Sequence, residues 1–192
     1  MKCIAIYLSL MISAFRLPAQ DSDFVRNEVY AGYGMLTDIR IAFETENFLG
    51  IIAGAQYADV KGPGAFMAGY SRYLSRKVSL GATVTYQYLQ ITGTYSSGEP
   101  INNYYSLLNV MARFDYHYVN DEKVQIYSGA ALGPSFILGK WQDAEGREKH
   151  FAPFVAYQLN LIGMRVGRTW AGYGELGFGR NGLLTLGISR RF

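Results

Sequence analysis

The chain has 192 residues and a formal net charge of +3, and only 17% of its residues are charged although 49% are hydrophobic. Soluble proteins are about 25% charged, so the chain is poor in charge, yet it is not apolar enough for a bundle of membrane helices. Its 22 glycines and 16 tyrosines, against 5 prolines, disfavour disordered, collagen-like and coiled-coil proteins and favour many strands joined by tight turns.

The N-terminal residues have the layout of a secretory signal peptide. The basic Lys2 precedes 13 mostly apolar residues, 3–15. This stretch is shorter than the roughly 20 apolar residues that span a bilayer, and it has the length of a signal-peptide hydrophobic region. We therefore predict a signal peptide over 1–20 and a mature domain over 21–192, with a buried N-terminal helix as the alternative. Cys3, the only cysteine, would leave with the signal peptide, so no disulfide is expected in the mature domain.

From residue 28 onward, apolar and polar residues alternate in the way that gives a strand one apolar and one polar face. In the segment 104–118, aliphatic residues flanked by tyrosines share one face, whereas the charged residues all fall on the other. Tyrosines at both ends of an apolar face are typical of a strand that crosses a membrane. The segments with this alternation predict eight strands, at 28–34, 65–74, 78–91, 104–118, 124–136, 151–163, 170–178 and 184–192.

The connectors between these segments alternate in length. The short connectors are 75–77, 120–122 and 165–168, and the longer ones are 35–63, 93–102 and 138–149, with 180–182 as a tight fourth. Short turns at one rim and longer loops at the other are typical of bacterial outer-membrane barrels. The predicted fold is therefore all-β, an eight-stranded antiparallel transmembrane β-barrel.

The first long connector contains a candidate for a short amphipathic helix, over 37–53. Thr37 and Asp38 are suitable N-cap residues. Residues at helical spacing follow them, at Ile39, Ala42, Phe43 and Glu46. The alternative is an extended hairpin that continues the first two strands.

Three segments carry a resemblance to a known class of protein: the end of the signal at Pro18-Ala19-Gln20, the strand VYAGYG at 29–34, and the C-terminal ELGFGRNGLLTLGISRRF at 175–192. In these features the chain resembles a small outer-membrane β-barrel protein, similar to the eight-stranded families that include outer-membrane proteins A, X and W. Such barrels end in an aromatic residue that the barrel-assembly machinery recognises. The resemblance therefore implies that Phe192 is an assembly signal, although Arg190 departs from the apolar alternation before it. It implies a fold and a location, and no particular activity.

Several charged and amide residues fall on the polar faces of their strands. Arg113 and Glu175 fall at similar heights when residues are counted from the turns. Because buried charges must be paired, we predict a polar network inside the barrel, made of Glu28, Arg113, Asp115, Gln158, Asn160 and Glu175. Such a network can simply fill the lumen of an eight-stranded barrel, which has room for side chains or one small ligand. A gated narrow pore is the alternative.

The sequence offers no clear enzyme or metal site. His117 and His150 fall at opposite rims by this assignment, too far apart to ligate one metal ion. Outer-membrane lipases place a histidine and a serine within hydrogen-bond reach of each other, and neither histidine here has a serine two residues later. We expect no catalytic residue, no cofactor and no metal.

These observations predict an integral protein of the outer membrane of a Gram-negative cell envelope, monomeric and non-enzymatic. Its role would be membrane integrity, surface interaction or porin-like, restricted passage of small solutes. Its partners would be outer-membrane lipids and the barrel-assembly machinery. Nucleic acid is not expected as a partner, because no run of basic residues is longer than two. The alternatives are a lipid-modifying outer-membrane enzyme and a soluble secreted barrel that binds an apolar ligand, as lipocalins do.

Overall fold

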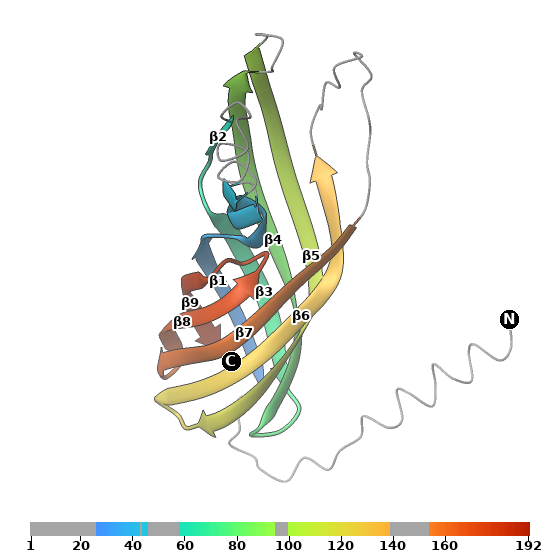
Figure 1. The fold of residues 1–192 in the computed structure, drawn as a ribbon. Helices are drawn as coiled ribbons and strands as arrows, with labels where there is room; N and C mark the ends of the chain where they lie inside the picture. The colour runs from blue at the N-terminus through green and yellow to red at the C-terminus, as the bar shows by residue number, and fades with distance from the viewer. Residues whose placement is uncertain (1–25, 43, 46–57, 95–99, 139–153) are drawn as a thin grey trace, which may run out of the picture.

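A computed structural model describes residues 26–42, 44–45, 58–94, 100–138 and 154–192, and these residues form an all-β protein (Figure 1). The predicted signal peptide at 1–20 and His150 lie outside the described residues. The strands in the described part of the chain are β1 (Asn27–Met35), β2 (Ala58–Lys61), β3 (Ala65–Tyr73), β4 (Val78–Thr94), β5 (Pro100–Asn120), β6 (Val124–Leu138), β7 (Phe154–Gly167), β8 (Trp170–Gly179) and β9 (Leu184–Arg191).

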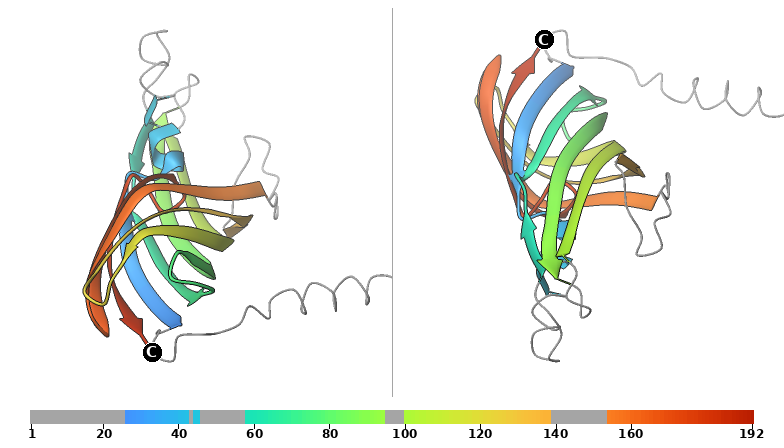
Figure 2. Two further views of the ribbon diagram at one scale, coloured as in Figure 1. Left: turned by 90° about the horizontal axis from the view of Figure 1, so that it is seen from below. Right: turned by 90° about the horizontal axis from the view of Figure 1, so that it is seen from above.

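All of these strands except β2 form a closed antiparallel barrel (Figures 1 and 2). Each barrel strand pairs with its neighbours along the chain, and β9 pairs with β1 to close the sheet, with Val29 opposite Arg190. The prediction of an eight-stranded antiparallel barrel is confirmed. Closure leaves no free strand edge around the barrel wall, so the backbone groups of neighbouring strands satisfy one another.

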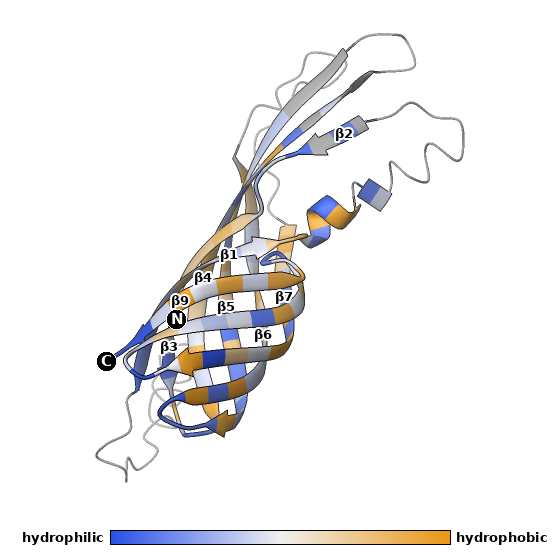
Figure 3. Cartoon of the chain, turned by 90° about the vertical axis from the view of Figure 1, so that its left-hand side faces the viewer, coloured by the Kyte–Doolittle hydropathy of each residue, from blue (hydrophilic) through white to orange (hydrophobic). Residues whose placement is uncertain are grey.

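Hydrophilic and hydrophobic residues alternate along the strands (Figure 3). The polar residues of this alternation face the inside of the barrel, and the apolar residues face outward. In β4, for example, Ser79 and Gln87 are buried, whereas Leu80 and Val84 are exposed. The alternation alone did not establish which face of each strand points inward. The structure answers that question, because the lumen is lined mainly by hydroxyl, amide and charged side chains.

Two barrel strands continue beyond the barrel at the end opposite the C-terminus (Figure 1). Strand β5 is 21 residues long and pairs with β4 along the whole of β4. The short strand β2 adds to this extension, with residues 58–61 paired to 90–93 of β4. Strand β2 was not predicted, because residues 35–63 were expected to form one long connector. We call the β2–β4–β5 extension the projecting sheet.

A short helix follows β1, as predicted, and covers residues 38–42 and 44–45 of the described chain. Thr37 is its N-cap: its carbonyl accepts the amide of Ile41 at 2.9 Å, and its Oγ1 accepts the amide of Arg40 at 3.4 Å. The remainder of the predicted helix, 46–53, lies outside the described residues. No helix among the described residues is long and apolar enough to cross a membrane.

Three pairings contain a β-bulge: β5–β6, β6–β7 and β7–β8. The bulge between Asn160 and Ile162 in β7 changes which residues face the lumen. Before it, Asn160 points inward; after it, Leu161 and Ile162 are both exposed, and Gly163 and Arg165 are the inward residues. Because the alternation resumes after the bulge, strand β7 continues to Gly167, beyond the end predicted at 163.

Candidate functional site

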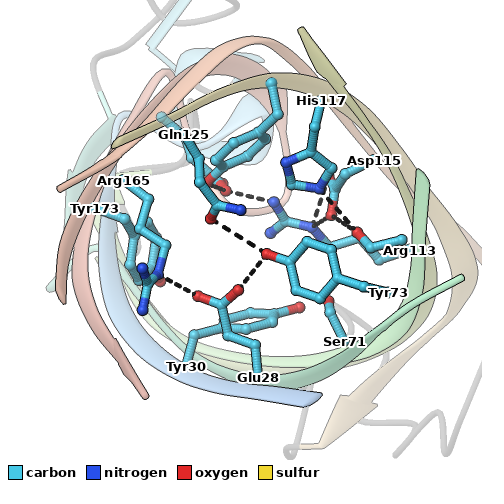
Figure 4. Close-up of a pocket in the computed structure, with 13 residues that line it drawn as sticks. Glu28, Tyr30, Ser71, Tyr73, Arg113, Asp115, His117, Gln125, Arg165 and Tyr173 are labelled. Atoms are coloured by element: carbon cyan, nitrogen blue, oxygen red, sulfur yellow. Dashed lines mark hydrogen bonds and ion pairs between the residues drawn. The ribbon is translucent and has the colours of Figure 1, made fainter. Parts of the chain in front are cut away.

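The lumen near the chain termini holds a small cavity lined by charged, aromatic and amide side chains (Figure 4). The space left for the centres of water molecules is about 20 Å³. These side chains therefore fill the lumen and leave room for only a few waters. The lining comes from seven strands, with Glu28 on β1, Tyr73 on β3, Ser79 on β4, Arg113 on β5, Gln125 on β6, Arg165 on β7 and Glu175 on β8.

Arg113 lies at the middle of this lining and binds two carboxylates. Its Nε donates to the Asp115 carboxylate at 2.8 Å, and its Nη2 donates to Oε1 of Glu175 at 2.5 Å. Glu175 also accepts a bond from Nδ2 of Asn160 at 3.1 Å, and Asn160 in turn accepts from Nε2 of Gln158 at 3.0 Å. We call Arg113, Asp115 and Glu175 the central cluster. All three side chains are buried, so their charges are removed from water and depend on one another.

Tyrosines surround the central cluster. The guanidinium carbon of Arg113 lies 5.1 Å from the ring centroid of Tyr30 and 5.8 Å from that of Tyr127. Both distances are within the range of a cation–π interaction. The hydroxyl of Tyr127 donates to Oε1 of Glu175 at 2.7 Å. The rings therefore fix the position of the guanidinium while hydrogen bonds fix the carboxylate.

A second charged group lies closer to the end of the barrel where the chain terminates. Glu28 accepts a bond from Nε of Arg165 at 2.8 Å, and its other oxygen lies 3.5 Å from Nε of Arg191. The hydroxyl of Tyr73 donates to Glu28 at 2.5 Å and accepts from Nη2 of Arg191 at 2.9 Å. We call Glu28, Arg165 and Arg191 the rim cluster. It carries one more positive than negative charge, whereas the central cluster carries one more negative charge.

The structure brings five of the six predicted network residues into one chain of contacts, from Arg113 and Asp115 through Glu175 to Asn160 and Gln158. The sixth residue is not part of that chain, since Glu28 belongs to the rim cluster.

Two members of the rim cluster were not selected from the sequence. Arg165 was assigned to a turn, because strict alternation cannot anticipate the bulge that places it in the lumen. A signal was available in the consecutive apolar residues Leu161 and Ile162, after which the alternation resumes with the opposite parity. Arg191 fell on the polar face of its predicted strand, but nothing in the sequence indicated that it pairs with Glu28.

The lumenal tyrosines pack against glycines of neighbouring strands. A Cβ atom built on Gly163 would overlap the ring of Tyr127, and one built on Gly69 would overlap the ring of Tyr30. Each glycine therefore provides the space that a large ring needs inside a narrow barrel. This pairing explains part of the high glycine and tyrosine content of the chain.

Gly163→Ala is expected to lower the free energy of unfolding by about 1–3 kcal/mol, because the new methyl group displaces the Tyr127 ring. Urea unfolding of the refolded barrel measures the change. The matched control is Gly172→Ala, since a Cβ there comes no closer than 4.0 Å to the carbonyl of Gly187. Equal stability of the two variants would contradict the packing role of Gly163.

One serine–histidine pair occurs in the lumen. Oγ of Ser79 lies 3.2 Å from Nε2 of His117 and 3.4 Å from the Asp115 carboxylate. A serine hydrolase holds the other ring nitrogen of its histidine with a third group and leaves room for substrate. Among the described residues, no hydrogen-bond partner reaches Nδ1 of His117, and the cavity of about 20 Å³ has no room for an acyl chain. The pair is therefore part of the lumenal packing. The described residues also hold no group of three or more potential metal ligands.

The short helix is bound at the opposite mouth of the barrel. Asp38 forms a 3.0 Å ion pair with Nη1 of Arg180, and the Arg180 guanidinium lies 4.8 Å from the Phe154 ring centroid. Burial raises the pKa of the Asp38 carboxyl, and the charge of Arg180 opposes the shift. Thr37 accepts a 2.7 Å bond from Nε2 of Gln87. The helix is thus held to the barrel wall by both charged and neutral bonds.

An apolar cluster packs against the helix. Leu89 and Leu107 are buried there, and Ile39 of the helix packs against them. The lumen therefore has an apolar layer near the helix and a charged layer near the termini, both filled by side chains. No protein-family model matches this chain, and no curated protein matches it either. What the protein does must therefore follow from its lumen and its surfaces.

Proposed function

We propose that this protein is an integral β-barrel of the outer membrane of a bacterium with two membranes, similar in type to the small eight-stranded outer-membrane families. Its role in this proposal is non-enzymatic. The barrel acts as a closed membrane anchor that supports membrane integrity and surface contact. The partners are outer-membrane lipids and, through Phe192, the barrel-assembly machinery.

The observation that carries the proposal is the apolar outer wall. Leu161 is 73% exposed, Val155 65% and Leu132 61%. Large exposed side chains of this kind come from all eight barrel strands, whereas soluble monomers rarely expose apolar patches of more than a few hundred Å². A soluble barrel that binds an apolar ligand would have the reverse arrangement. Here the charged side chains are buried inside the barrel and the large apolar side chains are exposed on its outside.

Aromatic side chains on the outer wall support the same proposal. Toward the terminal end the exposed rings are Tyr70, Tyr116, Tyr118 and Trp170, and toward the helix end they are Phe66, Tyr86 and Tyr104. Tyrosine and tryptophan are enriched at the two interfaces of a membrane, where the ring is in hydrocarbon and the polar atom is in water. Two belts on either side of an aliphatic zone fit a membrane-spanning wall.

The filled lumen favours an anchor over a pore. Solute passage needs a continuous water-filled path, whereas the charged layer leaves only about 20 Å³ for water centres and the short helix is bound at the other mouth. The projecting sheet extends away from the barrel at the helix end (Figure 1). In a membrane-inserted barrel this sheet would stand beyond the bilayer, available for contact with other molecules at the cell surface.

The test combines membrane fractionation with a heat-shift gel and a bilayer recording. We expect the protein in the outer-membrane fraction, a band that changes mobility on boiling, and no stepwise conductance from the purified barrel in a planar bilayer. An unshifted band in the soluble fraction would overturn the membrane assignment. Discrete conductance steps from a heat-shifting barrel would keep the membrane assignment and overturn the closed lumen.

A further inference from the structure

The outer wall carries two arginines at the terminal end of strands whose outward residues are otherwise apolar. On β9, Arg190 follows the outward Leu186 and Ile188, and on β3, Arg72 follows the outward Phe66 and Tyr70. Both arginines are exposed. At the end of a membrane-facing wall, the long side chain of an arginine can extend its guanidinium to the polar interface, where lipid phosphates lie.

The strand register places these two arginines on one seam of the barrel. Arg190 is opposite Val29 of β1, and Arg72 is opposite Asn27 of the same strand. Because neighbouring strands lie about 4.8 Å apart, the two arginines are separated by one strand, about 10 Å across the sheet. Their long side chains can therefore reach one group placed over β1.

Each arginine has an aromatic neighbour: Tyr70 is on β3 within the seam, and Trp170 is on β8, which adjoins β9 on the side away from β1. Trp170 is opposite Arg190, whose guanidinium carbon lies 5.5 Å from the Trp170 ring. Stacking on a ring leaves the N–H edges of a guanidinium free to bind an anion. Tyr70, beside Val29, donates a 2.6 Å hydrogen bond to Oδ1 of Asn27. These rings mark the level at which lipid headgroups meet the hydrocarbon.

The surrounding charge at this end of the barrel is mostly positive. Exposed cations lie on the adjoining turns, at Arg76, Lys77, Lys123 and Arg168. The exposed acidic side chains of this end, among the described residues, are Asp121 and Glu122, and Glu122 lies 3.7 Å from Arg168. Phe192 pairs with Asn27 through the backbone, and the half-buried Arg26 precedes Asn27, so the charge around the seam remains positive with the Phe192 carboxylate counted.

We propose that Arg72 and Arg190, with Trp170 and Tyr70, bind the headgroup phosphate of an anionic phospholipid at this seam. The inference rests on the proposed membrane location. A phosphodiester accepts paired N–H bonds from guanidinium groups, and a lipid without an ammonium group offers no cation that competes with the two arginines. The acyl chains would lie along the apolar side chains farther up the wall, such as Ile188.

The experiment is a lipid titration of the refolded barrel, followed by native mass spectrometry. The probes are dioleoylphosphatidylglycerol and dioleoylphosphatidylcholine. We expect tighter binding of the first phosphatidylglycerol than of phosphatidylcholine. Each cation near an anionic lipid is worth a factor of about five, so R72Q/R190Q should weaken the phosphatidylglycerol affinity about 25-fold. R72K/R190K keeps the charge but loses the paired N–H geometry, and it should bind with intermediate affinity.

The matched control is K77Q/K123Q, which removes the same charge from the same end of the barrel but away from the seam. It should keep the affinity of the unaltered protein within about twofold. An equal loss in both glutamine variants would overturn a defined site and indicate diffuse attraction to the whole rim. Equal affinity for the two lipids would also overturn the inference. A heat-shift gel on each sample separates these results from a failure of the proposed function, since a protein that never becomes a heat-shifting barrel contradicts the membrane location itself.

Discussion

Arg113→Leu should lower the free energy of unfolding by about 3–5 kcal/mol, because it leaves Asp115 and Glu175 buried without a counter-charge. Leucine also removes the cation from between the rings of Tyr30 and Tyr127. The carboxylates cannot move to water, since the cavity beside them is small and the barrel wall is closed. Equilibrium unfolding in urea, with the barrel refolded in lipid vesicles, measures the loss.

Two further variants distinguish the loss of the buried ion pairs of Arg113 from the effect on stability of removing any arginine. Arg168→Leu removes an exposed arginine whose partner Glu122 is 3.7 Å away, and exposed pairs contribute about 0–1 kcal/mol. R113M/D115N/E175Q removes all three central charges together, and it should regain most of the lost stability because no unpaired charge remains buried. If Arg113→Leu cost no more than Arg168→Leu, the central cluster would not be the structural network that its distances indicate.

The barrel was predictable because its causes are local and repeated. Alternation along each strand, tyrosines at strand ends and the lengths of the connectors all agree on eight antiparallel strands. The N-cap at Thr37 was predictable for the same reason, since its hydrogen bonds go to the next few residues. Strand β2 was not, because its pairing with residues 90–93 is a contact between distant segments and its own sequence is short.

For the lumen, the sequence predicted only which residues share a strand face. Alternation placed Arg113 and Glu175 on the polar faces of their strands, and the closed barrel brings their side chains within 2.5 Å of each other. Alternation fails at a bulge, which is why Arg165 was missed. Alternation also does not show which charged residues form ion pairs. The predicted network grouped Glu28 with Arg113, whereas the register across β9 and β1 places Glu28 opposite Arg191.

Glu28→Leu should lower the free energy of unfolding by about 2–4 kcal/mol, because it leaves the Arg165 and Arg191 guanidiniums together without their shared carboxylate. The expected loss is smaller than for Arg113→Leu. Arg165 keeps bonds to the carbonyls of Gly167 at 3.1 Å and Arg168 at 2.9 Å, which lie at the turn. The same vesicle-based urea unfolding measures the change, with Glu122→Leu as the exposed acidic control.

A double-mutant cycle shows whether this loss comes from the ion pair itself. Arg165→Met alone should destabilise the barrel, because Glu28 then loses its closer cation and keeps the 3.5 Å contact with Arg191 and the hydroxyl of Tyr73. E28L/R165M should be more stable than the sum of the two single losses predicts, by about 1–3 kcal/mol, as for residues in one network. Once Glu28 is gone, removing Arg165 relieves the repulsion between two buried cations. Strict additivity would mean that Glu28 and Arg165 do not share a desolvated pair, and that water reaches the rim cluster through the open end of the barrel.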